Sequence, residues 1–274
     1  MPSHIILWPI FVYVGAALFI PRLRPWLGRP ARTLGILLSG VVAFLASLLL
    51  VQQTGATPLQ WTLSTWRGLA GVGHGIQFQV DTLGSAFVLL VGLTGLGVLV
   101  GSLDEPELGT SEDYQAGILA LLGALVMLGL AGNLLTLLLA EFMLEAAIIF
   151  AVGLAGQPRW FLVTVMHTVI SQGLLLGATL LLWKETGNTA LAGASEQVLL
   201  FLIFAAITRM APLPFSLFPI AFEHLPQRVL GILPLSTLAV GGLLLGRIAQ
   251  NVTLEALPPL DGLASLGALG IALG

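Results

Sequence analysis

Long apolar stretches, separated by short polar or glycine- and proline-containing connections, dominate the pattern of this chain. A helix needs about 20 predominantly apolar residues to cross the hydrocarbon core of a bilayer. By that measure the sequence predicts eight membrane-spanning helices, at about residues 4–20, 33–52, 82–102, 115–131, 133–154, 160–183, 197–222 and 228–248. A further apolar run begins near residue 258 and continues to Gly274, which predicts the start of a ninth helix.

The connection at residues 53–81 has a different pattern. Apolar side chains alternate with polar ones in LQWTL, at Leu59, Trp61 and Leu63, and again in IQFQV at residues 76–80. Alternation with a period of two is typical of β-strands, and a glycine-rich segment lies between the two runs. The pattern predicts a small β-hairpin on the outer membrane surface, with an irregular interfacial loop as the alternative.

The composition agrees with a membrane protein. Of the 274 residues, 57% are hydrophobic and only 8% are charged, and the mean hydropathy is +1.02. Soluble domains carry about 25% charged residues, so we expect an integral membrane protein in contact with the lipid bilayer. The net charge of −3 gives no basic surface for a nucleic acid. The absence of cysteine excludes thiolate metal sites and Cys-ligated iron–sulfur clusters.

Basic residues predict the orientation of the chain in the membrane. Cytoplasmic loops carry an excess of lysine and arginine, and the first predicted loop, PRLRPWLGRPAR, holds four arginines. Placing this loop in the cytoplasm puts the N-terminus on the outer side of an energy-conserving inner or plasma membrane. Six basic residues then lie on the cytoplasmic side, and three lie on the outer side: Arg67, Lys184 and Arg247.

Four ionisable residues fall inside the predicted spans: Glu141, Glu145, His167 and Arg209. A charged group at membrane depth costs about 2.5–3.5 kcal/mol on insertion scales, so it indicates function by default. At about 1.5 Å of rise per residue, Glu141 lies roughly 12 Å from the outer face, and Glu145 and Arg209 both lie roughly 18 Å from it. His167 lies roughly 10 Å from the cytoplasmic face. We therefore expect these four side chains to form one buried polar row.

The seventh predicted span contains a break. Pro212, Pro214 and Pro219 cannot continue a helical hydrogen-bond ladder, so we expect the helix to end just after Arg209. Irregular backbone at membrane depth is tolerated only inside protein or beside water, and broken membrane helices commonly line ion or substrate sites. A charge beside such a break is a more specific signal than either feature alone.

These residue types suit proton transfer. A buried carboxylate tends toward its neutral form unless a cation lies close to it, so we expect Glu141 to accept protons and Arg209 to be its counter-charge. Arginine keeps its proton, whereas histidine titrates near neutrality and could relay protons. Glu145 and His167 are the expected supporting residues. The alternatives are an ion pair that only holds two helices together and an ordinary buried histidine.

Three stretches resemble the antiporter-like proton-channel subunits of respiratory complex I: VDTLGSAFVLLVGLTGLGVLV at 80–100, GNLLTLLLAEFMLEAAIIFAVGL at 132–154 and TRMAPLPFSLFPIAFEHLP at 208–226. These subunits are similar to those of multi-subunit cation/proton antiporters and membrane-bound hydrogenases. The first stretch contains Asp81–Thr82 where the family has an Asp–Gly type pair. The second places Glu141 on the family's key glutamate, and the third resembles its broken seventh helix.

The resemblance implies an all-α polytopic membrane protein with three parts. Residues 1–114 would hold the first three helices and the outer hairpin, residues 115–250 a five-helix antiporter-like repeat, and residues 251–274 the start of a further helix. Family members contain two inverted repeats, so we expect this chain to correspond to their N-terminal half. Quinone, flavin and iron–sulfur clusters would belong to partner subunits of the membrane assembly, and this chain would carry no cofactor or metal.

The sequence departs from the family pattern at several positions. Arg209 stands where the family usually has lysine, and Ser216 stands where it usually has histidine. An aspartate expected just after Pro219 is absent, and the eighth span has no lysine or histidine to relay protons. The remaining candidates for a polar relay are hydroxyl side chains: Thr208, Ser216, Ser236 and Thr237.

The expected function is translocation of protons or cations in the membrane arm of a complex I-like assembly, such as an NADH–quinone oxidoreductase, coupled to redox chemistry in partner subunits. Two alternatives remain. One is a structural subunit that has lost pumping, which the missing lysine and histidine favour, and the other is a stand-alone cation/proton antiporter. The sequence contains no phosphate-binding loop, zinc motif or hydrolase elbow, so we expect no catalysis by this chain alone.

Overall fold

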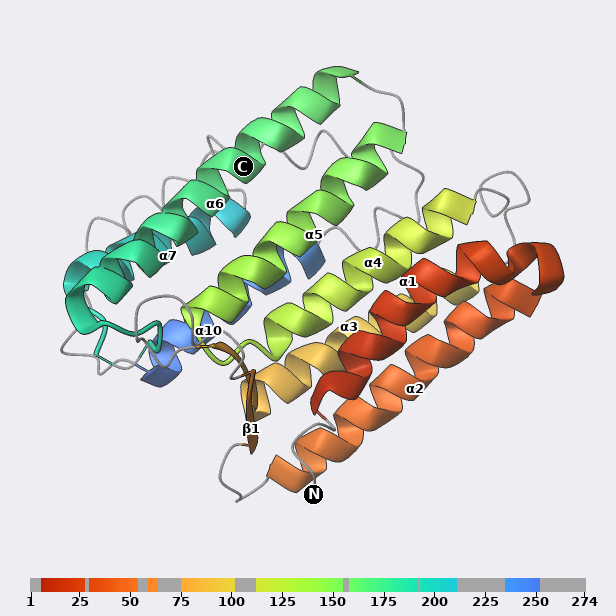
Figure 1. Cartoon of the computed structure of the whole chain (residues 1–274), viewed down its shortest axis with the longest axis horizontal. Helices are drawn as coiled ribbons and strands as arrows, with labels where there is room; N and C mark the ends of the chain where they lie inside the picture. The colour runs from red at the N-terminus through yellow and green to blue at the C-terminus, as the bar shows by residue number, and fades with distance from the viewer. Residues whose placement is uncertain are drawn as a thin grey trace, which may run out of the picture.

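The computed structural model describes residues 6–27, 30–53, 59–63, 75–101, 112–154, 158–191, 193–210 and 235–251. This part of the chain is mostly helical, with one small two-stranded sheet (Figure 1). The helices are α1 (Trp8–Leu27), α2 (Pro30–Gln53), α3 (Thr82–Gly101), α4 (Glu112–Gly129), α5 (Leu134–Leu154), α6 (Pro158–Thr186), α7 (Glu196–Met210) and α10 (Val240–Asn251). A short π-helical segment, η4 (Leu235–Ala239), leads directly into α10.

Each described helix overlaps one of the apolar stretches of the sequence. Within the described residues, Thr33–Gln52 and Thr82–Gly101 are long and apolar enough to cross a membrane by length and composition. The number of membrane spans therefore stays a prediction. The second half of the predicted seventh span, with its prolines, and the apolar run after residue 258 lie outside the described residues.

The helices pack in two layers (Figure 1). Helices α6, α5, α4 and α1 follow one another in one layer, and α7, α10, α3 and α2 follow one another in the other. Helices α5 and α7 therefore lie diagonally across the bundle, and both pack against α6. A long side chain from α7 can reach α5 through the middle of this group.

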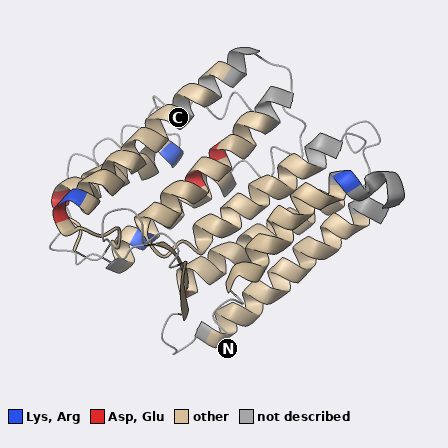
Figure 2. Cartoon of the chain, viewed as in Figure 1, with Lys and Arg blue, Asp and Glu red and all other residues tan. Residues whose placement is uncertain are grey.

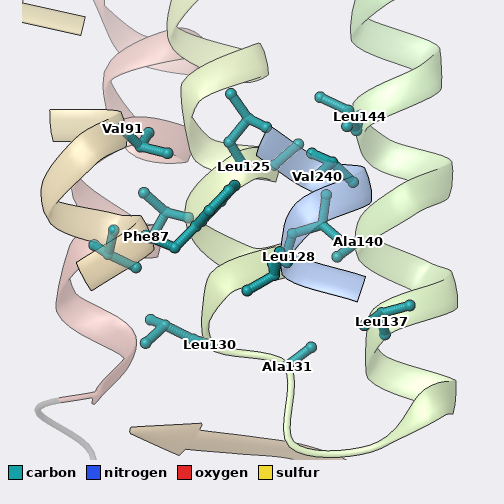
Figure 3. Packing of buried hydrophobic residues seen from close by; sticks show 14 of the residues in the cluster. Phe87, Val91, Leu125, Leu128, Leu130, Ala131, Leu137, Ala140, Leu144 and Val240 are labelled. Atoms are coloured by element: carbon teal, nitrogen blue, oxygen red, sulfur yellow. The ribbon is translucent and has the colours of Figure 1, made fainter. Parts of the chain in front are cut away.

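Apolar side chains fill the space between the layers and also cover the outside. Figure 3 shows Leu137 and Leu144 of α5 directed toward the core residues of α4 and α10. On the outside, Phe11, Phe19 and Phe44 are 62–64% exposed. A surface that exposes many large apolar side chains suits contact with lipid rather than with water.

The predicted hairpin is confirmed. Strands β1 (Leu59–Leu63) and β2 (Ile76–Val80) pair antiparallel, which places Trp61 opposite Phe78, with 6.0 Å between the centres of the two rings. The alternation of apolar residues is met in this register, because side chains two residues apart share one face of a sheet and Trp61 and Phe78 lie on the same face. The membrane surface on which the hairpin lies stays a prediction.

Hydrogen bonds attach the hairpin to the start of α5. The backbone N–H of Gln79 donates to the carbonyl of Leu130 (2.8 Å), and the N–H of Gly132 donates to the carbonyl of Gln77 (2.8 Å). The Asn133 side chain accepts a hydrogen bond from the backbone N–H of Thr136 (2.9 Å), as an N-cap does, and donates to the carbonyl of Gly75 (3.0 Å). Asn133 therefore caps the N-terminus of α5 and also binds the backbone next to β2.

An ion pair between Asp81 and Arg247 connects three helices at the hairpin end of the bundle. Asp81 caps α3, because its side chain accepts a hydrogen bond from the N–H of Gly84 (2.7 Å). Arg247 of α10 also donates to the carbonyl of Gly129 at the end of α4 (2.8 Å). Arg247 was one of the three basic residues expected on the outer side. It lies within α10, which continues to Asn251, and its side chain is buried. The side of the membrane stays a prediction.

Two substitutions of Asp81 should separate its two roles. Asp81→Asn keeps an acceptor for the cap but removes the counter-charge of Arg247, so the free energy of unfolding should fall by about 3–5 kcal/mol. Asp81→Ala also removes the cap and should cost about 1 kcal/mol more. Denaturant unfolding of the purified protein in detergent measures both values. An Asp81→Asn protein as stable as the wild type would contradict the structural role of the pair.

Candidate functional site

Three charged side chains meet in the interior of the bundle. Glu141 and Glu145 lie on α5, and Arg209 lies in the last turn of α7. Arg209 donates a hydrogen bond from Nη2 to Oε2 of Glu141 (2.6 Å) and forms a second ion pair with Glu145 through Nη1. Their exposed fractions are 0% for Arg209 and 1% for each glutamate. We call these three residues the charge cluster.

Helix geometry explains why both glutamates reach the same partner. Residues four apart lie on one face of a helix, one turn above the other. The side chains between them, Phe142 and Met143, are exposed on the opposite side of α5, so the acidic face points inward. The matching depths predicted for Glu145 and Arg209 agree with this contact, because the rise per residue is the same in all helices.

The two glutamates of the charge cluster lie away from the ends of α5. Figure 2 shows acidic positions halfway along α5, whereas most other described charged residues lie at helix ends. Lys184 and Glu185 end α6, and Glu196 begins α7. Among the described residues, Arg209 is the basic side chain that contacts both carboxylates.

The number of charges in the cluster is unequal. Two carboxylates face one guanidinium, and these three side chains together carry one negative charge when both acids are ionised. A buried charge is costly unless a partner compensates it, and the charge of these three side chains falls to zero when one acid binds a proton. Oε1 of Glu141 has no hydrogen-bond partner among the described residues.

Buried hydroxyl groups lie beside the arginine. Thr208 precedes Arg209 in α7 and is 3% exposed. Ser236 and Thr237 lie in η4, which packs against α7, and both are buried. Single-turn π-helical segments are frequent at functional sites. The described relay candidates therefore occur on segments adjacent to the cluster, and their role stays a prediction.

Several predicted site residues cannot be placed. His167 lies on α6, but its side chain is outside the described residues. The same is true of the whole segment that contains Ser216 and the three prolines, Pro212, Pro214 and Pro219. Within the described residues, no group of three or more acidic or histidine side chains could hold a metal ion.

Gln172 is a buried polar residue that the sequence analysis missed. It lies on α6, is 5% exposed, and neither atom of its amide has a hydrogen-bond partner among the described residues. Gly177 of α6 packs against the ring of Phe201 in α7. Because the two helices run antiparallel, this contact places Gln172 near the level of Ala206, within one turn of Arg209. The signal in the sequence is a glutamine inside an apolar stretch, which indicates a buried polar side chain although it carries no charge.

Solved structures of membrane complexes share this arrangement of helices. A chain of the Mrp complex from Dietzia sp. DQ12-45-1b matches 90% of this chain with a TM-score of 0.73 and 21% identity. A chain of the membrane-bound sulfane sulfur reductase, an archaeal respiratory membrane complex, matches 97% of it with a TM-score of 0.76 and 15% identity. The chain has their fold. It spans 28% and 56%, respectively, of the two chains.

The predicted resemblance to complex I-like antiporter-type subunits is thereby confirmed at the level of the fold. No protein-family model and no curated protein matches this sequence. At these identities the likeness describes the path of the backbone, and the chemistry has to be argued from the residues of this chain.

Removing the arginine should destabilise the protein, and removing its partners as well should reverse much of the effect. Arg209→Met leaves two carboxylates buried without a cation, so the free energy of unfolding should fall by about 3–5 kcal/mol. Adding Glu141→Gln and Glu145→Gln should recover most of that loss. Denaturant unfolding in detergent compares the variants, with Arg22→Met on an exposed part of α1 as the control. A triple variant as unstable as Arg209→Met would contradict the pairing.

Proposed function

We propose that this chain is a membrane subunit that translocates protons, or a cation that replaces them, as part of a complex I-like assembly. The observation that carries the proposal is the charge cluster, in which two buried carboxylates share one guanidinium. A buried carboxylate next to a guanidinium can hold, lose and regain a proton as that positive charge moves closer or further away. Such loading and unloading is the elementary step of translocation.

In the proposed mechanism, Glu141 takes up the proton and Arg209 sets how strongly it is held. When Arg209 lies closer to Glu141, its positive charge favours the ionised carboxylate, so Glu141 releases its proton. When Arg209 lies closer to Glu145, Glu141 favours its neutral form. Arginine remains charged throughout, so movement of its side chain, and not its own titration, would change the state of the cluster.

The remaining polar side chains would connect the cluster to its surroundings. Thr208 and the hydroxyls of η4, Ser236 and Thr237, can both donate and accept hydrogen bonds, as a proton relay requires. The Gln172 amide, near the level of Arg209, can hydrogen-bond the water molecules of such a relay but cannot pass on a proton itself. His167 stays a proposed relay residue of α6.

We propose that redox chemistry resides in partner subunits, which would hold the quinone, flavin and iron–sulfur clusters. The proposal is supported by the similar structures, both of which come from membrane complexes. The absence of cysteine from this chain also removes the usual ligands of iron–sulfur clusters. This subunit would then convert a conformational change in its neighbours into movement of charge.

One observation favours a structural role as the second candidate. Arg209 contacts both glutamates at once, and a guanidinium cannot release its proton to change the balance. A fixed cluster of this kind would hold α5 and α7 together without moving protons. The two candidates make different predictions for a substitution that keeps the shape of Glu141 and removes its ionisation.

Glu141→Gln should abolish translocation while the assembly remains intact. The amide has the size of the acid but cannot bind and release a proton at neutral pH, so we expect substrate-driven proton movement to fall at least tenfold. A pH-sensitive dye in membrane vesicles that contain the assembly measures it. Glu196→Gln, on the exposed start of α7, is the matched control. Full assembly with undiminished proton movement would favour the structural role.

A further inference from the structure

Gln172 of α6 is a buried amide whose position in an apolar interior needs a reason. Its side chain is 5% exposed, and neither its oxygen nor its nitrogen has a hydrogen-bond partner among the described residues. Leaving a buried donor or acceptor unsatisfied is costly, and an apolar side chain of the same length would avoid that cost. A glutamine at this position is therefore explained by a partner that it meets in another state of the protein.

The packing of α6 against α7 places Gln172 close to the charge cluster. Gly177, five residues after Gln172, packs against the ring of Phe201, and this contact puts Gln172 near the level of Ala206. Arg209 lies three residues further along α7, about 4.5 Å along the helix axis. Side chains lean toward the N-terminus of their own helix. In two antiparallel helices, Gln172 and Arg209 therefore lean toward each other's level.

The packing of α6 against α5 gives the same level. The N–H of Leu134 donates to the carbonyl of Thr189 (2.9 Å), so the start of α5 lies beside the end of α6. Counted from these ends, Glu145 lies about 17 Å along α5 and Gln172 lies about 21 Å along α6. Gln172 is thus within about one helical turn of Glu145. Because α6 packs against both α5 and α7, its buried side at this level borders the two helices that carry the cluster.

Arg209 has more donors than the two glutamates occupy. A guanidinium carries five N–H groups. Nη2 donates to Glu141 and Nη1 is paired with Glu145, whereas Nε has no hydrogen-bond partner among the described residues. The exposed fraction of Arg209 is 0%, so its further acceptors have to be internal. The amide oxygen of Gln172 is an acceptor at this level that no described residue occupies.

We propose that Gln172 is the third partner of Arg209 and holds the guanidinium when it releases Glu141. The inference rests on the proposed function, in which Arg209 moves between the glutamates. In the released state, Arg209 keeps its ion pair with Glu145 and donates a hydrogen bond to the Gln172 oxygen. Glu141 then has no counter-charge beside it and favours its neutral form. Gln172 is a positioning residue, because it acts through Arg209 and transfers no proton itself.

Gln172→Met tests the inference, because methionine has the length of glutamine but only a weak acceptor. Arg209 should then remain at Glu141 and favour the ionised carboxylate. We expect the pH at which half of Glu141 is protonated to fall by about one unit or more, which is a tenfold loss of proton affinity. Infrared difference spectroscopy of the purified assembly measures it from the C=O band of the neutral acid. Glu141→Gln identifies this band by removing it.

Thr179→Val is the matched control. Thr179 lies on α6 seven residues after Gln172, is also buried, and donates to the carbonyl of Leu175 in its own helix (2.8 Å). Valine has nearly the same shape and removes this buried hydroxyl, so it should leave the protonation of Glu141 unchanged. An unchanged midpoint in Gln172→Met, or the same shift in Thr179→Val, would overturn the role of Gln172.

A second measurement separates holding of the guanidinium from ordinary packing. Lysine has three donors on one nitrogen and no Nε group, so it has less need of a third partner. In an Arg209→Lys protein, Gln172→Met should therefore change the proton affinity of Glu141 less than twofold. A shift as large as that in the protein with arginine would show that Gln172 acts through packing, and the inference would fail.

The proposed function and this inference fail in different ways. If Glu141→Gln abolishes translocation while Gln172→Met leaves the midpoint of Glu141 unchanged, the function stands and Gln172 is no partner of Arg209. If Gln172→Met shifts the midpoint while Glu141→Gln leaves translocation undiminished, Gln172 positions Arg209 and the proposed function fails.

Discussion

A fully buried guanidinium is the constraint on which the interior of this protein depends. Arg209 cannot lose its charge, and a charge in an apolar interior needs compensation close by. The position of helix α7 must therefore allow Arg209, in its last described turn, to contact both glutamates of α5. The two helices lie diagonally in the bundle, so one long side chain fixes a distance that backbone packing alone does not.

The sequence could predict the features that follow from regular geometry. The rise of a helix is constant, so the matching depths of Glu145 and Arg209 followed from counting residues, and alternation was enough to predict the two strands of the hairpin. It was not enough to pair Trp61 with Phe78, because a shift of two residues keeps the same faces. Contacts between segments distant in sequence could not be predicted in this way. The pairing of Asp81 with Arg247 depends on where α10 lies beside α3, which no local pattern encodes. The proline break and the His167 side chain lie outside the described residues, so the helix break and the relay role of His167 remain predictions.

Buried ion pairs occur at two levels of the described bundle. At the hairpin end, Arg247 pairs with Asp81 and joins α3, α4 and α10. In the interior, Arg209 pairs with both Glu141 and Glu145 and joins α5 and α7. The first group lies at the ends of helices, where it supports their packing, whereas the second lies within the bundle.

The attachment of the hairpin to Asn133 has a mechanical consequence. The residue that begins α5 is also the residue that holds the strand, and Thr136, one turn later, accepts a hydrogen bond from the backbone of Gln77. A neighbouring protein that displaced the hairpin would pull on the first turn of α5, and with it on Leu137. A displacement of the hairpin would therefore be transmitted to the helix that carries both acids.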